Sequence, residues 1–285
     1  MTETARRRGR QTRLSQVGKV EENPPVWPGV EAGRFKPLTE AEAALAEESA
    51  LSLLEDLGLK QAIPSMIDKV VAKGGSLTDD GRLLFPRSLV QWAIDGAQRG
   101  FSLCGQRPEN DLKVETAKVY MSTGGAAPGV FDLETHVYRD SSLQDLYDAA
   151  RIVDRMENIH HFSRSVVARD IEDNAVMDLN TAYACLSGTS KHVSISITAP
   201  QNVAEIADLC YRIAGSEEAF RARPFLTVMV CHVVPPMCFA EEACEVLEAA
   251  ILAGFPVQLI SAGQAGATSP ATIAGSLVQA VAETL

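Results

Sequence analysis

The sequence has 285 residues, with 26 lysines and arginines against 37 aspartates and glutamates, a net charge of −11 and a pI near 5.0. Hydrophobic residues make up 46% of it and the mean hydropathy is +0.01, a balance that excludes a disordered chain. The acidic total argues against nucleic-acid binding, and no apolar run approaches the roughly 18 residues of a membrane-spanning helix. We therefore expect a soluble globular protein with neither nucleic acid nor membrane as a partner.

Residues 1–33 are predicted to be a flexible basic tail followed by a proline-rich connector. Residues 1–20 carry five arginines and one lysine against a single glutamate, which gives this segment a net charge of +5. No apolar stretch follows these charges, as a secretory signal would require. Trp27 and Phe35 are expected to anchor the connector. The six cysteines lack paired spacing, which favours a reduced, cytoplasmic compartment.

Residues 34–105 are predicted to form a helical region. Thr39 and Glu42 have the spacing of a capping box, and the helix that they start is expected to end near Gly58. A second helix is predicted over Pro64–Ala72, and Pro86 opens a third. A small hairpin is expected between the second and third helices.

Residues 106–285 alternate between apolar, β-branched segments and helical patterns. The segments that begin at Phe162, Val193, Leu226 and Val257 start 31, 33 and 31 residues apart, about the length of one βα unit. This alternation predicts a parallel sheet, and the first strand lacks the G-x-G-x-x-G of dinucleotide-binding folds. The predicted class is therefore α/β, of the (β/α)8 TIM-barrel type. The expected strands are Val119–Thr123, Phe162–Val167, Val193–Thr198, Leu226–Val230 and Val257–Ser261.

Helix start signals follow most of these strands. Ser142 and Asp145 are predicted to form one capping pair, and Asn202 and Glu205 another, while Ser269-Pro270 is typical of a helix opening. The remaining two helices are expected over Asn174–Leu186 and Glu241–Leu252.

Only five of the eight units of a barrel are present, and the fifth helical pattern still runs at Leu285. An unclosed parallel barrel exposes two strand edges and half of its interior. The sequence therefore predicts a partial barrel over residues 106–285. We favour a fragment of a longer protein over completion by another chain or an open sheet.

Reactive groups in a βα barrel lie where the strands end and in the loops that follow. Thr123 ends the first predicted strand before a glycine-rich turn, Arg164 lies on the second, His232 ends the fourth, and Gln264 lies in the glycine-rich loop after the fifth. Tight turns alone also explain the glycines. His232 is either a ligand-binding or a packed histidine. Arg164 pairs either with an acidic ligand group or with an acidic residue of a neighbouring strand.

No metal site is predicted. Cys231, Cys238 and Cys244 are separated by seven and six residues, which does not match the compact ligand pairs of structural zinc sites even with His232 beside them. Inert, buried cysteines are the expected alternative.

Other chemistry-bearing side chains fall where strands begin. His160, His161 and His192 precede the second and third strands, so structural roles are expected for them. Lys191 lies at the same end, which makes it a poor Schiff-base lysine.

Several motifs together resemble one known family. They are Arg34–Thr39, Asp80–Pro86, Tyr120–Val130, Cys231–Met237 and Gly263–Gly275. In this order they are similar to the trimethylamine methyltransferase family, including its many members without pyrrolysine, and the resemblance runs from about residue 34 to the end.

The resemblance implies a (β/α)8 barrel that transfers a methyl group from a tertiary or quaternary amine. The acceptor in such systems is the Co(I) corrinoid (cobalamin) of a separate partner protein, so no cofactor is expected on this chain itself. Family members are much longer, and the region that carries pyrrolysine would lie beyond Leu285. Relatives without pyrrolysine include glycine betaine enzymes, which favours that substrate class. A homo-oligomer is also expected.

Aromatic or acidic side chains suit a quaternary ammonium group, and Tyr120 and Phe162 are candidates for that role. The substrate-binding candidates are thus Tyr120, Thr123, Arg164, His232 and Gln264, and no catalytic residue is identified. Two alternatives stay open. One is a lyase or aldolase-type barrel that binds an anionic substrate at the Gly263–Gly266 turn, and the other is an inactive, truncated scaffold.

Overall fold

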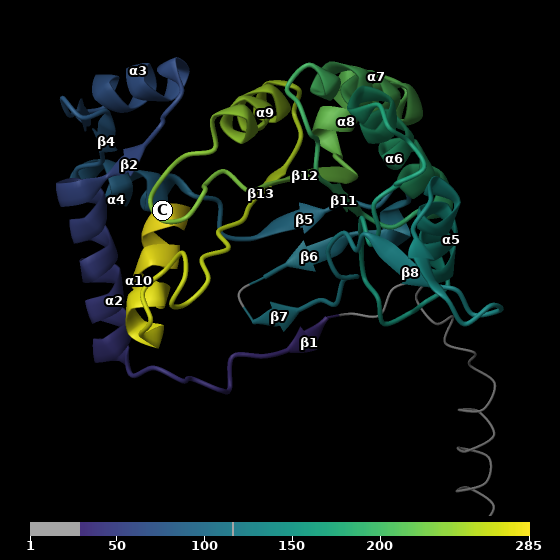
Figure 1. The fold of residues 1–285 in the computed structure, drawn as a ribbon, viewed down its shortest axis with the longest axis horizontal. Coiled ribbons are helices and arrows are strands. Elements are labelled where there is room, and N and C mark those ends of the chain that lie inside the picture. The colour runs from purple at the N-terminus through teal and green to yellow at the C-terminus, as the bar shows by residue number, and fades with distance from the viewer. Residues whose placement is uncertain (1–28, 116) are drawn as a thin grey trace, which may run out of the picture.

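A computed structural model describes residues 29–115 and 117–285 (Figure 1). The basic segment 1–20 and Trp27 lie outside these residues, so the expectations for them stay predictions. Phe35 is described and is 85% exposed, so the prediction that it anchors the connector is wrong.

A four-stranded parallel sheet organises the C-terminal part of the chain. Its strand order is β10-β11-β12-β13, so each strand pairs with the next one along the sequence. The register aligns Phe162 with Val193 and Val193 with Leu226, which confirms the regular βα spacing. The strands are β10 (Phe162–Ser163), β11 (Val193–Ile195), β12 (Leu226–Val230) and β13 (Val257–Leu259).

The first predicted strand takes a different form. Val119 belongs to β7 (Lys118–Val119), which pairs antiparallel with β1 (Val30–Glu31). Only Ser122 reaches the parallel sheet, through one isolated parallel bridge to His161. The prediction of a strand over Val119–Thr123 is therefore wrong, although this segment does lie alongside β10. The reason is local, because the Thr123 hydroxyl takes the hydrogen bonds that a strand backbone would make.

Helices cover one face of the parallel sheet (Figure 1). Their buried side chains pack with those of the strands into one apolar cluster, in which Leu146, Ile206 and Phe220 are fully buried. The apolar strand residues of this face and the buried residues of the helices thus form one core from which water is excluded. The covering helices are α5 (Leu143–Asp154), α6 (Asn174–Gly188), α7 (Asn202–Ala214), α8 (Glu217–Ala222) and α9 (Glu241–Leu252). The last helix, α10 (Ile273–Thr284), instead contributes Ala282 to a second apolar cluster.

Two helix starts differ from the predictions. Asn202 does not cap α7 but is its first residue, because its buried amide donates to Asp178 Oδ2 at 2.8 Å. The Ser269-Pro270 pair does not open α10, which starts after the N-cap residue Thr272. The Ser269 amide instead donates to the Gln264 carbonyl and closes a turn there. By contrast, the capping box at Ser142 and the bounds of α9 are confirmed.

The short helix α8 was not predicted. Ser216 caps it by accepting from the Ala219 amide at 3.0 Å. Its Phe220 ring packs edge-on against Phe225 and Phe255, with centroids 5.2 and 5.1 Å away. Six residues are too few to show a helical period in the sequence, so tertiary packing stabilises this turn of helix.

The N-terminal helical region follows its predicted order. The Thr39–Glu42 capping box and the helix over Pro64–Ala72 are confirmed, and Pro86 is the N-cap of the third helix. The second apolar cluster joins this region to α10 and to the loop after β12. The elements are α2 (Glu40–Ser52), the π-helical turn η1 (Leu53–Leu57), β2 (Leu59–Lys60), α3 (Pro64–Ala72), β3 (Ser76–Leu77), β4 (Arg82–Leu84) and α4 (Arg87–Gly96).

Two further hairpins lie between this region and the parallel sheet, and neither was predicted. Each of their strands has only three residues, which is too short to show a period from which to predict it. The first hairpin pairs β5 (Phe101–Leu103) with β6 (Leu112–Val114) across the 3-10 turn η2 (Pro108–Asn110), and the second pairs β8 (Gly129–Phe131) with β9 (Tyr138–Asp140).

The Ser142 capping box supplies a direct stability test. Ser142 Oγ accepts from the Asp145 amide, while the Asp145 carboxylate accepts from the Ser142 amide at 2.8 Å and from Arg139 at 2.7 Å. Ser142→Ala removes one acceptor from the first turn of α5 and should lower the free energy of unfolding by about 1 kcal/mol. Urea denaturation measures this change. Ser187→Ala, at an exposed position of α6, is the control, and an equal loss in both variants would contradict the cap assignment.

Candidate functional site

The carboxyl ends of the parallel strands meet at one edge of the sheet, where ligands of βα folds bind. Loops after β10, β11, β12 and β13 form this carboxyl edge. The sheet face opposite the helices, here called the inner face, leads to it. Ile195 and Val228 belong to the helix-covered core, so Ser194 and Thr227, next to them in the chain, point to the inner face.

The inner face is polar and largely hydrogen-bonded. Ser163 aligns with Ser194, and Ser194 with Thr227, so three hydroxyls cross the sheet in one row. Ser163 Oγ lies 3.0 Å from Ser122 Oγ, and Thr227 Oγ1 lies 2.8 Å from His192 Nε2. The three residues of this row are buried, so hydrogen bonds to other side chains, rather than to water, orient the hydroxyls of Ser163 and Thr227.

Two histidines lie at the opposite, amino edge of the inner face. The ring centroids of His161 and His192 are 6.5 Å apart. Burial lowers the pKa of each to about 4, so both are neutral at neutral pH. His192 Nδ1 lies 2.8 Å from the Cys104 carbonyl, which joins the first hairpin to the sheet. These contacts agree with the structural roles expected for these histidines.

His232 lies at the end of β12, as predicted, but its side chain is only 4% exposed. Its Nε2 donates to the main-chain carbonyl of Glu283 at 2.7 Å, so the ring is oriented by α10. Nδ1 is buried, and none of the residues described here bonds to it. The geometry matches the packed histidine more closely than one that faces a ligand.

Arg164 points toward the helix layer rather than the inner face. Burial lowers its pKa, while the negative charge of the nearby Asp178 on α6 acts in the opposite direction. Asp178 is fully buried, and its Oδ2 accepts from the Thr198 amide and from the Thr198 hydroxyl, both at 2.7 Å. The acidic neighbour of Arg164 thus comes from a helix, not from a neighbouring strand.

Tyr120 and Thr123 are held by the backbone. The Tyr120 hydroxyl donates to the Lys113 carbonyl at 2.7 Å, and its ring packs edge-on against His160. Thr123 Oγ1 donates to the Ser163 carbonyl at 2.6 Å and accepts from the Ser163 amide at 2.9 Å. Thr123 therefore joins its segment to β10, whereas Tyr120 joins it to β6 of the first hairpin.

Gln264 is the exposed member of the predicted set. Its carbonyl accepts from the amides of Ala267, Thr268 and Ser269, which closes the glycine-rich loop after β13. The structure thus brings His232 close to α10, whereas Tyr120, Arg164 and Gln264 lie in separate surroundings.

Sequence reasoning missed the two buried carboxylates of the carboxyl edge, Asp178 and Glu283. Each is an acid on an otherwise apolar or small helix face, and Gln279 precedes Glu283 by one turn. A polar residue and an acid four residues apart on the buried side of a helix could have identified Glu283 from the sequence, because a buried acid needs hydrogen-bond partners. Phe162, considered as a ring for the interior, lies instead in the helix-covered core.

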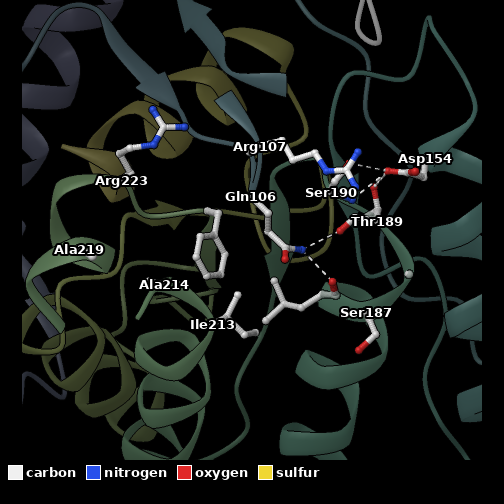
Figure 2. Close-up of a pocket in the computed structure, with 14 residues that line it drawn as sticks. Gln106, Arg107, Asp154, Ser187, Thr189, Ser190, Ile213, Ala214, Ala219 and Arg223 are labelled. Carbon is white, nitrogen blue, oxygen red and sulfur yellow. Dashed lines mark hydrogen bonds between the residues drawn. The ribbon is translucent and has the colours of Figure 1, made fainter. Parts of the chain in front are cut away.

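A cavity of about 610 Å³ opens at the amino edge (Figure 2). Its polar groups are largely occupied by the protein itself. Gln106 Nε2 donates to the carbonyls of Leu186 and Thr189 at 2.7 Å, and Asp154 Oδ1 accepts from the Ser190 amide at 2.8 Å. These bonds hold the segment between the end of α6 and the start of β11 in place. The polar groups of the cavity therefore stabilise the fold.

Within residues 29–115 and 117–285, no group of three or more His, Cys, Asp or Glu side chains is arranged to hold a metal ion. Cys244 is buried as expected, whereas Cys231 is exposed and Cys238 half-buried, so the prediction of buried cysteines is wrong for these two. The helices described are all too short or too polar to cross a membrane.

Known proteins similar to this chain share one activity in their names. A family model described as trimethylamine methyltransferase matches residues 6–285. A trimethylamine methyltransferase of Desulfitobacterium hafniense is 30% identical over 232 residues, which are 81% of this chain and 46% of that protein. One from Methanosarcina mazei is 28% identical over 242 residues, 83% and 49% of the two chains.

A glycine betaine methyltransferase of Desulfitobacterium hafniense is 23% identical over 253 residues, which are 88% of this chain and 52% of that protein. The chain thus spans about half the length of the curated relatives that it matches.

The buried histidines predict acid sensitivity. Because the pKa of His192 falls to about 4 in the folded state from an ordinary value of 6.5, protonation favours the unfolded chain. The contribution of His192 to stability should be full above pH 6.5 and decline by about 3 kcal/mol as the pH falls toward 4, and His161 should add a similar decline. Urea unfolding between pH 7 and 4.5 measures this. His192→Gln should remove its own part of the pH dependence and leave the part that His161 causes, whereas His136→Asn, at an exposed position, should change neither. A wild-type stability that does not change with pH would refute the prediction.

Proposed function

The chain belongs to the trimethylamine methyltransferase family, and from that premise we propose that the protein transfers a methyl group from a tertiary or quaternary amine to a corrinoid protein. The family match over residues 6–285 carries this proposal. The parallel βα arrangement, with its loops gathered at one edge, supports it. The Co(I) corrinoid of the partner protein supplies the nucleophile, and the chain supplies the place where the amine is held.

We propose further that the sheet is part of a (β/α)8 barrel. The four strands are parallel and consecutive, a fifth segment lies beside β10 at Ser122, and helices α5 to α9 cover one face of the sheet. The opposite face carries serine and threonine side chains, which suits the interior of a barrel that holds a ligand. In this proposal the longer relatives contain the remaining units.

The inner face supplies neutral groups to an amine substrate. Alternation along β12 and β13 places Met229 and Gln258 on the same face as Thr227, and their register pairs them with each other. Tyr120 is held at the amino edge and Phe162 in the core, so neither supports the aromatic lining proposed for a quaternary ammonium group. Gln264, exposed after β13, is the candidate that fits direct substrate contact, and Thr123, Arg164 and His232 fit support of the surrounding loops.

The lyase or aldolase alternative finds little support. Lys191 is 1% exposed, and its Nζ donates to the carbonyls of Val153, Met156 and Ile159 at 2.5–2.7 Å, so it cannot serve as a Schiff-base lysine without breaking the end of α5. The helix start expected to bind an anion at Ser269 lies instead at Thr272.

Methyl transfer tests the proposed function. The purified protein is incubated with a corrinoid protein reduced to Co(I) and, separately, with trimethylamine and glycine betaine. We expect the corrinoid absorbance to change as it takes up the methyl group from at least one amine. One control reaction omits the amine, and a second contains heat-treated protein. No absorbance change with any tertiary or quaternary methylamine would overturn the proposal.

A further inference from the structure

Glu283 is a buried acid at the carboxyl edge, held by neutral donors. Its side chain is 3% exposed, yet Oε1 accepts from the Met237 amide and from Gln279 Nε2, both at 2.9 Å. Oε2 accepts from the Ser261 hydroxyl at 2.5 Å. Three hydrogen bonds to a carboxylate are strong enough to retain it in a buried position.

The same residue joins two successive loops. Met237 lies in the loop after β12, and Ser261 lies just after β13, so one carboxylate of α10 holds both. The main-chain carbonyl of Glu283 accepts from His232, at the start of the first loop. Each end of residues 232–237 is therefore fixed to Glu283.

This loop also connects to the N-terminal helical region. The Met237 carbonyl accepts from the Lys60 amide at 3.2 Å, and the Phe239 amide donates to the Lys60 carbonyl at 2.8 Å. Cys238 Sγ donates to Gln61 Oε1 at 2.7 Å. Gln61 and Met237 both have left-handed backbones, with φ of +57° and +52°. Such conformations are unfavourable for residues with a side chain and persist only where their surroundings hold them.

We propose that Glu283 is a positioning residue, whose carboxylate holds the loops after β12 and β13 in place around the substrate site and joins them to the N-terminal helical region. This role rests on the proposed function, because the substrate site is part of it. Removing the carboxylate leaves the Met237 amide and the Ser261 hydroxyl without the acceptor that α10 supplies to both.

Amide hydrogen exchange on the whole chain tests the proposal without any methyl transfer. In Glu283→Ala, exchange in residues 231–239 and 59–61 should accelerate at least tenfold, while the strands β11 and β12 keep their wild-type rates. The half-buried Cys238 thiol, which donates to Gln61 Oε1, should react faster with a thiol reagent by a similar factor. Glu283→Gln keeps one carbonyl oxygen for Met237, and its amide can donate to Ser261, so it should restore rates to within threefold of wild type.

Glu242→Ala, at an exposed position of α9, is the matched control and should change nothing in these segments. Where Glu283→Ala does not fold, Ser261→Ala removes a single bond and should raise exchange about threefold beside residues 237 and 261. Unchanged exchange in these segments, or an equal rise throughout the molecule, would overturn the proposal.

Methyl transfer by the same variants gives the second measurement. Glu283→Ala should raise KM for the amine at least tenfold and lower kcat less than threefold, with rescue by Glu283→Gln. Equal KM values in both variants and wild type would show that the loops do not position the substrate. A wild-type protein without methyl transfer would overturn the proposed function alone, because the exchange pattern decides separately whether Glu283 holds the loops.

Discussion

Burial of one face of the parallel sheet is the constraint on which the rest of the structure depends. Val193, Ile195, Leu226, Val228 and Val230 are at most 3% exposed because helices cover them. Apolar burial of this kind is the main stabilising term in folding. It requires a helix after every strand, and that requirement sets the chain spacing and gathers the connecting loops at the edges of the sheet.

The loop ends are then fixed by buried polar groups that belong to helices. At the amino edge, Lys191 and Gln106 satisfy carbonyls at the ends of α5 and α6. At the carboxyl edge, Asp178 and Glu283 accept from loop amides and hydroxyls. Burying any of these groups without a hydrogen-bond partner would cost a large desolvation free energy. The surrounding backbone must therefore adopt the arrangement that supplies the partners. Apolar packing thus places the layers, and these side chains place the loops.

This division explains what the sequence could reveal. The strand starts at Phe162, Val193, Leu226 and Val257 and the bounds of α9 followed from periodicity, which reports apolar burial directly. The capping box at Ser142 followed from a three-residue spacing. Long-range polar contacts leave no such local pattern, because Asp178 and Thr198, or Met237 and Glu283, are 20 and 46 residues apart. Of the predicted site residues, His232 and Gln264 therefore follow strands at the carboxyl edge, whereas Tyr120 lies at the amino edge, and the carboxylates that hold the carboxyl edge were missed.

The neutral inner face bears on the proposed reaction. A quaternary ammonium group loses its positive charge when a nucleophile takes its methyl group, because both electrons of the broken C–N bond stay on nitrogen as the lone pair of a neutral amine. A negatively charged wall would stabilise the cation before transfer more than the neutral amine after it, and binding energy spent on the ground state does not accelerate the reaction. The hydroxyls of Ser163, Ser194 and Thr227, together with Met229 and Gln258, avoid that penalty. The buried acids of the carboxyl edge, Asp178 and Glu283, accept hydrogen bonds from the loops, Asp178 on one oxygen and Glu283 on both. Their charge therefore stabilises the loops rather than the substrate cation.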